Sequence, residues 1–377
     1  MDNIVISTTL ENVCLKQNKS IISGPFGSNI SSKFFVERGI PVIRGNNLTV
    51  GKEKFLDYGF VYVTDEKAKE LNCYALKDDL IFTSAGTLGQ VGIIPENARF
   101  KEYVISNKQI RVRIDNDIIL PIYAYYWFSS PWIQKKLCDN NKGSTVPLLT
   151  LSEIKSLPIK YPKDINEQKK IVNILNSIDE QLKRNSEMVQ KLQVLSQTVF
   201  NYYYSNNNKK TVKLKTIAKM YQPETITGSD FIENGKYPVY GSGGIIGRYD
   251  KYNHTDSELM ISCRGLCGNI SLSLPYSWII GNQMIIKPSD SKLKYYLYNY
   301  LQIINLKKVE TGSVQKQITR ANLENLDVEL LDENILSLIA NRLELIHNEL
   351  IKVIKMNDKL NSLKNTLLPL LINQQLT

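Results

Sequence analysis

Two long stretches of the chain carry apolar residues at alternating steps of three and four positions. The stretch 166–204 contains no proline or glycine, and its apolar stripe begins at Leu175. The stretch 334–368 begins the same pattern at Leu343, which lies 168 residues later (343 minus 175). A period of 3.5 residues, held over about four heptads, predicts a helix whose apolar face is buried against another helix.

Each of these helices offers the other a matching apolar face. Because a globular unit separates them in the sequence, an antiparallel pair is the simplest arrangement. Asn185 in the first stripe matches Val353 in the second, and Asn357 in the second matches Val189 in the first. Buried polar positions of this kind set the register of a helix pair. The alternative, in which each helix packs separately on its own domain, stays open. The predicted seam consists of Leu175, Ile178, Leu182, Val189, Leu192, Leu343, Ile346, Leu350, Val353 and Leu360.

The rest of the chain also contains an internal repeat. Three pairs of segments carry this repeat: 143–150 with 312–319, 84–91 with 263–270, and 107–111 with 282–286. Around them, short β-rich runs alternate with clusters of Gly, Pro and Asn, and one helical stretch follows the strands in each copy (122–139 and 293–307). This order indicates two mixed α/β units of the same topology.

We therefore predict an α/β (α+β) fold with a pseudo-twofold internal repeat. Two similar globular domains, which the resemblance described below identifies as target-recognition domains, are separated by a long antiparallel coiled coil of two helices. A chain of 377 residues is long enough for two such domains. The predicted boundaries are 1–162 for the first domain, 163–205 for the central spacer helix, 206–331 for the second domain and 332–377 for the C-terminal spacer helix.

Nearly all of the net charge of +10 lies on the globular units. Residues 1–162 carry 20 Lys and Arg against 16 Asp and Glu, and residues 206–331 carry 16 against 11. The two helical stretches are close to neutral. Basic charge divided between paired domains suits a polyanion that both domains touch. The alternative from charge alone is a mildly basic protein with solvated lysines.

Motifs for catalysis are missing from the sequence. It contains neither a G-x-x-x-x-G-K-[ST] phosphate loop nor the Asn-Pro-Pro-Tyr or Asp-Pro-Pro-Tyr motif of amino-methyltransferases. The glycine-rich segment 241–244 is predicted to be a turn between strands, and His254 a surface imidazole. Five cysteines without a C-x-x-C pair, together with two histidines, do not favour a zinc site. We expect no catalytic residue, no metal and no cofactor.

No apolar run approaches the roughly 20 residues that span a bilayer. The sequence also starts without a basic segment followed by an apolar stretch, and the cysteine usage fits a reducing compartment. We therefore expect a cytoplasmic protein without a membrane partner.

Polar residues suited to nucleic acid recur in the loops of both units. Arginine pairs with guanine and asparagine with adenine in the major groove, and lysine contacts phosphate. Taken one at a time, each of these residues is more typical of a solvated loop, and the prediction rests on their recurrence in both units. The predicted DNA-binding residues are Ser28, Asn29, Lys33, Arg44, Asn46, Asn47, Thr87, Lys142, Arg264, Gln315, Lys316 and Gln317.

Several short motifs combine along the whole chain. The first copy contains Ser-Gly-Pro-Phe-Gly-Ser at 23–28, Ile-Pro-Val-Ile-Arg at 40–44 and Thr-Ser-Ala-Gly-Thr-Leu-Gly at 83–89. The second copy contains a Tyr-Pro-Val-Tyr-Gly-Ser-Gly-Gly run at 237–244, Gly-Ser-Val-Gln at 312–315 and the terminal heptad helix. Together they resemble the specificity subunit of type I restriction–modification systems. The second copy lacks the Gly-Pro-Phe-Gly-Ser stretch, so its DNA-facing loops are expected to differ.

The resemblance implies a non-catalytic DNA reader of a bipartite target, with one half read by each domain. Adenine methylation and DNA cleavage would then be carried out by partners, namely two methyltransferase subunits docked on the helices and motor–nuclease restriction subunits. S-adenosylmethionine, ATP and magnesium would bind those partners. From the residues alone, a two-headed protein-binding scaffold for acidic partners stays the alternative, and a fused methyltransferase is disfavoured by the missing motifs.

Overall fold

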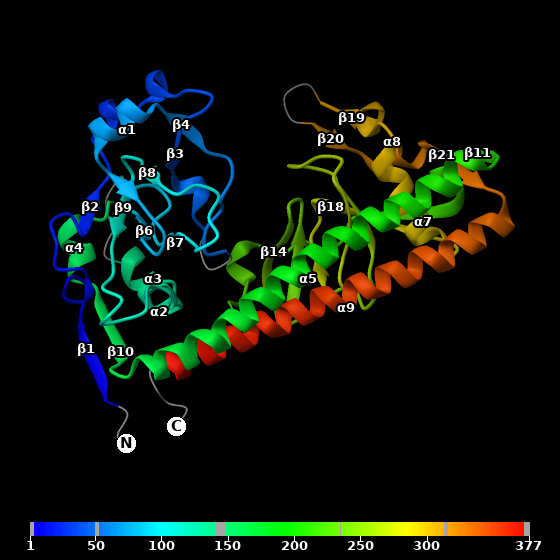
Figure 1. Cartoon of the computed structure of the whole chain (residues 1–377). Helices are drawn as coiled ribbons and strands as arrows, with labels where there is room; N and C mark the ends of the chain where they lie inside the picture. The colour runs from blue at the N-terminus through cyan, green and yellow to red at the C-terminus, as the bar shows by residue number, and fades with distance from the viewer. Residues whose placement is uncertain (1–3, 50–52, 140–147, 234, 313–315, 373–377) are drawn as a thin grey trace. The chain divides into compact units, whose positions relative to one another are not determined.

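The chain forms two compact units in the computed structural model, which describes residues 4–49, 53–139, 148–233, 235–312 and 316–372 (Figure 1). Unit 1 comprises Met1–Gln181 together with Leu360–Thr377, and unit 2 comprises Leu182–Lys359. Both long helices, α5 (Ile165–Asn206) and α9 (Glu333–Ile372), are therefore divided between the units. The boundaries predicted from the sequence treat these helices as segments of their own.

Unit 1 is built on two four-stranded sheets, in the orders β2-β9-β6-β7 and β4-β3-β8-β5. A separate antiparallel pair joins β1, near the N-terminus, to β10 (Figure 1). Strands β6, β8 and β9 are buried along their whole length, as expected for short continuous apolar runs. The strands are β1 (Val5–Thr9), β2 (Ile21–Ser23), β3 (Ile40–Ile43), β4 (Val61–Val63), β5 (Tyr74–Ala75), β6 (Leu80–Thr83), β7 (Val91–Ile93), β8 (Tyr103–Ile105), β9 (Gln109–Val112) and β10 (Pro158–Pro162).

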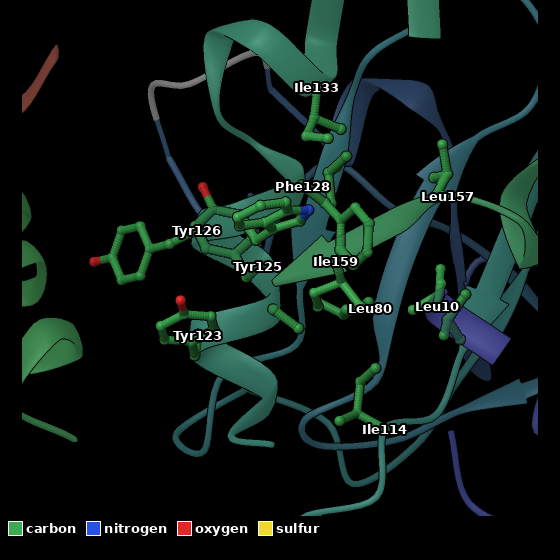
Figure 2. Close-up of a cluster of buried hydrophobic side chains, with 14 of the residues drawn as sticks. Leu10, Leu80, Ile114, Tyr123, Tyr125, Tyr126, Phe128, Ile133, Leu157 and Ile159 are labelled. Carbon is green, nitrogen blue, oxygen red and sulfur yellow. The ribbon is translucent and has the colours of Figure 1, made fainter. Parts of the chain in front are cut away.

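Three helices of unit 1 (α2, α3 and α4) pack with the sheet that contains β6, whereas Ala68 of α1 is buried with the sheet that contains β3. The predicted single helix at 122–139 is two helices, because Pro131 has no N–H for a continuous helix and restricts the residue before it. Seven of the eight residues of α2 are buried, and Figure 2 shows Tyr123 and Phe128 in this core beside Leu80 and Ile159. The helices are α1 (Asp65–Leu71), α2 (Pro121–Phe128), α3 (Pro131–Asp139) and α4 (Leu151–Lys155), with 3-10 turns η1 (Leu10–Val13), η2 (Gly27–Asn29), η3 (Ser32–Phe34) and η4 (Gly45–Asn47).

Unit 2 repeats this plan with a four-stranded sheet, β12-β18-β15-β16, and a three-stranded sheet, β14-β13-β17. The predicted helix at 293–307 ends earlier, at Ile303, and a 3-10 turn follows. The strands are β11 (Lys209–Lys213), β12 (Ala218–Tyr221), β13 (Tyr237–Gly241), β14 (Gly244–Tyr249), β15 (Leu259–Ser262), β16 (Ile270–Leu272), β17 (Trp278–Ile279), β18 (Gln283–Pro288), β19 (Glu310–Thr311), β20 (Gln317–Ile318) and β21 (Asp327–Leu331). The helices are α6 (Leu214–Ile217), α7 (Leu293–Ile303) and α8 (Arg320–Glu324), with turns η5 (Gly228–Asp230) and η6 (Leu306–Val309).

The strand pairings confirm the predicted internal repeat. In unit 1, β3 pairs with β4 in the antiparallel sense and with β8 in the parallel sense, and β13 pairs in the same way with β14 and β17. Thr150 and Thr319 occupy the same place in the two copies. Each side chain accepts a hydrogen bond from a backbone N–H of the helix that it caps, from Glu153 in α4 and from Asn322 in α8. The residues just before them, 143–147 and 313–315, lie outside the described part of the chain.

One part of the predicted alignment is wrong by one residue. The backbone N–H of Ser84 donates to the carbonyl of Lys108 (2.8 Å), and that of Cys263 donates to the carbonyl of Asn282 (2.9 Å). Because Ser84 and Cys263 are equivalent, Lys108 matches Asn282, the position that the sequence alignment gave to Asn107. The shift arises because both strands begin with Asn-containing turns of low sequence complexity, which do not fix a register.

Within unit 1, α5 and α9 pack against each other and against the domain. Leu175 of α5 and Leu368 of α9 are buried in the same core as the aromatic residues of α2. Asp179 lies one turn further along α5, and its carboxylate accepts a hydrogen bond from Lys364, one turn earlier on α9 (2.6 Å). Contacts that advance along one helix while receding along the other show an antiparallel pair.

Within unit 2, the same two helices are paired in the same sense. The hydroxyl of Ser196 lies 3.3 Å from the His347 ring nitrogen Nε2. Further along α5, Tyr203 has its ring beside the guanidinium of Arg342, earlier on α9 (5.4 Å from ring centroid). The antiparallel pairing predicted from the stripes is thus confirmed within each unit. The predicted seam residues Leu175, Ile178, Leu343 and Leu350 are buried, whereas Leu182, Val189, Leu192, Ile346, Val353 and Leu360 are half-buried.

Candidate nucleic-acid interface

Four loops of unit 1 meet beside the first residues of β9. The backbone N–H of Gly24 donates to the carbonyl of Gln109 (2.8 Å), which brings the loop after β2 against this strand. The N–H of Ser84 donates to the carbonyl of Lys108, which adds the β6–β7 turn. We call the segments 24–29, 44–48, 84–90 and 106–108 the unit 1 loop cluster.

Gln90 fastens the third of these segments to the second. Its side-chain oxygen accepts a hydrogen bond from the Thr83 hydroxyl (2.9 Å), and its Nε2 donates to the carbonyl of Leu48 (3.1 Å). These bonds connect the η4 loop to β6. Loops cross-linked through a half-buried glutamine present their exposed side chains from a fixed backbone, as specific recognition requires.

The structure brings several predicted residues together in this cluster. Ser28, Asn29, Asn46 and Thr87 are exposed there, and Arg44 is half-buried at the end of β3. Lys33 is exposed but lies in η3, where its Nζ is 4.8 Å from the ring centroid of Phe34, outside the cluster. Lys142 falls outside the described residues.

Asn47 holds the loop together and does not face solvent. It is fully buried, its Oδ1 accepts a hydrogen bond from the N–H of Arg44 (3.0 Å), and its Nδ2 donates to the carbonyls of Leu56 (3.1 Å) and Tyr58 (2.9 Å). A contact with a base would break these bonds and leave buried polar groups unpaired. We therefore remove Asn47 from the predicted DNA-binding set.

Three exposed residues of this region were missed by the sequence analysis. Lys108 is exposed in the cluster and adds a cation directly before β9. Tyr58, whose carbonyl is bound by Asn47, has a side chain that is 62% exposed, and Phe26 in the segment 24–29 is 88% exposed. Lys108 stands in a polar run, which is a usable signal. Nothing in the local sequence distinguishes Tyr58 or Phe26 from core aromatics.

Unit 2 assembles a similar cluster, in which three segments correspond to segments of the unit 1 loop cluster and the fourth, 316–318, corresponds to residues 147–149. The Ser262 hydroxyl donates to the carbonyl of Ser242 (3.1 Å), and the side chain of Gln283 donates to the carbonyl of Gly241 (2.6 Å). The N–H of Ile318 donates to the carbonyl of Cys263 (3.1 Å). We call the segments 241–244, 263–269, 280–282 and 316–318 the unit 2 loop cluster. The predicted turn at 241–244 is confirmed as the hairpin between β13 and β14.

The predicted residues of unit 2 lie on this cluster. Arg264, Lys316 and Gln317 are all exposed, and Lys316 forms an ion pair with Glu310 (3.0 Å). Gln315 falls outside the described residues. Arginine and glutamine side chains on such loops supply the paired donors and acceptors that read base edges, and lysine supplies charge for phosphate.

The β6–β7 and β15–β16 turns share one backbone conformation. Their four glycines have positive φ angles in the left-handed region: Gly86 (98°), Gly89 (85°), Gly265 (77°) and Gly268 (81°). A side chain at these positions would be strained, so the glycines fix the turn. Between them, Thr87 in the first copy is replaced by Leu266 in the second. The two clusters therefore share a backbone frame and differ in the side chains that they expose.

His254 is not the surface imidazole that the sequence predicted. It is 9% exposed, its Nε2 lies 3.0 Å from the hydroxyl of Tyr221, and its Nδ1 lies 2.6 Å from the side-chain oxygen of Asn253. Burial lowers the pKa of His254, and the positive charge of Lys287 adds to this effect. The side chain is thus a neutral structural group of unit 2.

The two loop clusters lie within two matches to one family model. The type I restriction modification DNA specificity domain matches residues 13–193 and 206–364. The chain belongs to this family. Its two copies of the domain correspond to the two repeats and include most of both long helices.

Individual relatives support the same assignment. The chain is 29% identical over 184 residues to the type I restriction enzyme MjaIX specificity subunit of Methanocaldococcus jannaschii, covering 47% of this chain and 41% of that protein. It is 24% identical over 190 residues to the HindI specificity subunit of Haemophilus influenzae, covering 48% and 39%. The matched region thus spans about two fifths of the length of these curated relatives.

A solved structure shares the fold along nearly the whole chain. The type I restriction–modification system S subunit from M. genitalium superposes with a TM-score of 0.59 at 16% identity, covering 98% of this chain and 96% of that one. Among the described residues, no helix has both the length and the hydrophobicity needed to cross a membrane.

Proposed function

We propose that the chain is a non-catalytic specificity subunit that reads a bipartite DNA target, one half with each loop cluster. The observation that carries this proposal is the repetition of one glycine-fixed backbone frame with different exposed side chains in the two units. Readers of two unrelated half-sites need this combination, because the frame places side chains in a groove while the side chains choose the bases. The basic excess on both globular units supplies attraction to the DNA backbone.

Arg264 tests this proposal in unit 2. With the full-length chain and a target selected from random duplexes, Arg264→Ala is expected to weaken binding by about 1–3 kcal/mol. If Arg264 reads a base, selectivity relaxes only in the second half-site, whereas a phosphate contact would lower affinity for all sequences and reduce the salt slope by about one. The measurement is fluorescence anisotropy over a series of salt concentrations.

Lys251→Ala is the matched control for Arg264→Ala, because it removes one exposed cation of unit 2 outside the loop cluster. We expect it to leave the selected sequence unchanged. If Arg264→Ala and Lys251→Ala had equal effects on DNA affinity and sequence selection, Arg264 would contribute only general positive charge. A full-length chain that selects no sequence, and prefers acidic proteins to duplex DNA, would favour a protein-binding scaffold.

We further propose that two copies of one partner, the methyltransferase subunit, dock on the outer faces of α5 and α9. Each helix has one exposed stripe at spacings of four and three residues, which places its members on one face. The stripe of α5 is Arg184, Met188, Lys191, Leu195 and Thr198, and that of α9 is Lys352, Met356, Lys359, Leu363 and Thr366. The α9 stripe follows the α5 stripe by the same 168 residues as the buried seam.

The apolar members of these stripes are unusually exposed for their type. Met188 and Leu195 are each 48% exposed, and Met356 and Leu363 are 50% and 46% exposed. Exposed apolar residues grouped on a helix face mark an interaction surface. The same residue types at equivalent positions support two equivalent sites for identical partners.

Loss of one stripe is expected to remove one partner copy. Leu195→Asp or Leu363→Asp, each co-expressed with the methyltransferase subunit of the same host, should change the assembly from two partner copies per chain to one, because a charge is placed in an apolar contact. Native mass spectrometry measures this change. Ser186→Asp, which adds the same charge to an exposed position of α5 off the stripe, should retain two copies. Two copies bound to both stripe variants would contradict the docking proposal.

A further inference from the structure

Phe26 is the most exposed large apolar side chain of the described residues, at 88%. It belongs to none of the buried hydrophobic clusters of unit 1. An aromatic side chain held in solvent gives up the stabilisation that burial provides. Since unit 1 has extensive aromatic packing elsewhere, the position of Phe26 calls for a cause other than the stability of the fold.

The backbone on both sides of Phe26 is held firmly. A side chain at Gly24 would collide with the carbonyl oxygen of Ser106, so the chain passes directly against the turn before β9. On the other side, a side chain at Gly27 would lie 3.3 Å from the Nδ2 atom of Asn107. The N–H of Asn29 also donates to the carbonyl of Phe26 (2.8 Å). The ring is therefore presented to solvent from a fixed backbone.

Polar side chains suited to DNA surround this position along the chain and across the loop. Ser28 and Asn29, which follow Phe26 after Gly27, are exposed, and Asn107 and Lys108 of the neighbouring turn are exposed as well. An exposed ring framed by amides, a hydroxyl and a cation is a composition used at nucleic-acid surfaces, where aromatic faces meet bases and cations meet phosphates.

Unit 2 offers no aromatic residue in the matching loop. The Gly-Pro-Phe-Gly-Ser stretch occurs only in the first copy, and the exposed apolar side chain of the unit 2 loop cluster is Leu266, at 61%. Leucine has no ring with which to stack on a base. The two clusters are therefore chemically different at their most exposed apolar residue, and among the described residues only the unit 1 loop cluster carries an exposed aromatic ring.

We propose that Phe26 inserts at a base-pair step of the half-site bound by unit 1 and unstacks that step. The inference rests on the proposed function and adds a mode of recognition to it: unit 1 reads the ease with which its DNA step opens, in addition to base edges. Pyrimidine–purine steps are the most easily opened, so the half-site of unit 1 contains such a step opposite Phe26. No counterpart occurs in the half-site of unit 2.

The test uses the full-length chain and duplexes that carry its selected target, with the fluorescent adenine analogue 2-aminopurine replacing in turn each adenine on either strand of both half-sites. Its fluorescence rises when it is unstacked. We expect the wild-type chain to raise the fluorescence at one step in the first half-site only. Phe26→Ala should abolish this rise and weaken binding roughly 10- to 100-fold, because one base–aromatic contact is lost.

The salt dependence separates this role from a charge effect. Phe26→Ala should leave the slope of affinity against salt unchanged, since no phosphate contact is removed. Phe26→Trp should keep the fluorescence rise, whereas Phe26→Leu should restore part of the affinity without full unstacking. Tyr202→Ala is the control, because Tyr202 is a 65% exposed aromatic residue on α5, outside the loop cluster.

Each other outcome has a distinct meaning. If the wild-type chain selects a target but Phe26→Ala binds it with unchanged affinity and fluorescence, the proposed insertion of Phe26 is wrong while the DNA-reading function stands. If Phe26→Ala leaves DNA binding intact but lowers retention of the methyltransferase subunit, the ring contacts that protein and the inference is wrong. If the wild-type chain selects no DNA sequence, the proposed function fails and the inference fails with it.

Discussion

Replacing Asp179 with alanine is expected to lower the free energy of unfolding by about 3–5 kcal/mol. The Asp179 carboxylate is largely buried in unit 1 and lies 2.6 Å from the Nζ of Lys364 and 3.0 Å from the Nζ of Lys54. It also accepts a hydrogen bond from the hydroxyl of Tyr126 (2.7 Å). Removing one partner from such a network leaves two partly buried ammonium groups without their counter-charge. The ring of Tyr126 lies beside both lysines and does not replace that charge.

The pH dependence of this network has a defined sign. Burial alone would raise the pKa of Asp179, but the charges of Lys364 and Lys54 and the hydrogen bonds outweigh burial, so the pKa lies below its ordinary value of 3.8. A carboxylate with a lowered pKa in the folded state contributes stability above its unfolded pKa. That contribution is lost as the pH falls below about 4 and through the folded pKa. The difference in stability between wild type and Asp179→Ala should shrink over this range.

Urea unfolding of the full-length chain measures the effect, and Glu167→Ala provides the control. Glu167 forms an ion pair with Lys170 on the same helix (2.7 Å), but Lys170 is 70% exposed. Exposed pairs of this kind contribute about 0–1 kcal/mol. If both alanine variants lost the same small amount, the Asp179 network would be no more important than a surface pair.

The heptad stripes show which features of this fold are predictable from the sequence. Leu175 and Leu343 open two stripes whose 3.5-residue period predicts paired helices, and the structure pairs these helices within each unit. The strands and turns of both globular copies also follow from short apolar runs and glycine clusters. These signals are local and periodic, so one sequence is enough to detect them.

The polar contacts of the helices could not be predicted in this way. Asp179 is one of many acidic residues on a long helix, and a charged residue there indicates a solvated face. Its burial depends on Lys54 and Tyr126, which come from loops and helices far away in the sequence. The stripe drew attention to Asn185 and Asn357 as polar interruptions, whereas Asp179 lies outside the stripe.

The candidate interface was predictable as a set of loops and not as a set of residues. Asn46 and Asn47 are adjacent and identical in type, yet Asn46 is exposed and Asn47 is fully buried. Only the three-dimensional course of the loop, which brings Leu56 and Tyr58 against Asn47, separates their roles. Asn47 is a polar residue that proved to be buried, and Phe26 is an aromatic residue that proved to be exposed. Phe26 was missed because an aromatic residue in a glycine-rich loop usually packs inward.

The repeat also relates the polar contacts of the two units. His347 of α9 follows Asp179 of α5 by 168 residues, and Lys364 follows Ser196 by the same number. Unit 1 therefore has a charged Asp–Lys pair where unit 2 has a neutral Ser–His pair. Equivalent positions with different chemistry give the two units different responses to pH.

The free energy of unfolding is expected to fall by about 2 kcal/mol between pH 7 and pH 5 because of His347 alone. Its ring is 2% exposed, stacks on Tyr295 (4.6 Å between centroids) and meets Tyr298 edge-on (5.0 Å). Burial lowers the pKa of His347 to about 4, and the positive charge of Lys294 adds to the shift. The unfolded chain therefore binds a proton below pH 6.5 that the folded chain does not bind. Stability is fully present above pH 6.5 and is lost as the pH falls toward 4.

Comparison of His347→Phe with the wild type isolates this contribution. Phenylalanine retains the stacking on Tyr295 but does not titrate, so urea unfolding of the variant at pH 7 and pH 5 should show a loss smaller by about 2 kcal/mol. His254 is buried in the same unit and its pKa is lowered too, so His254→Phe should remove a separate part of the pH dependence. The lower end of this pH interval, pH 5, lies above the range in which most carboxylates titrate. Equal pH dependence in wild type and His347→Phe would mean that the His347 ring takes up its proton over the same pH range in the folded and unfolded chains, and burial would then not lower its pKa.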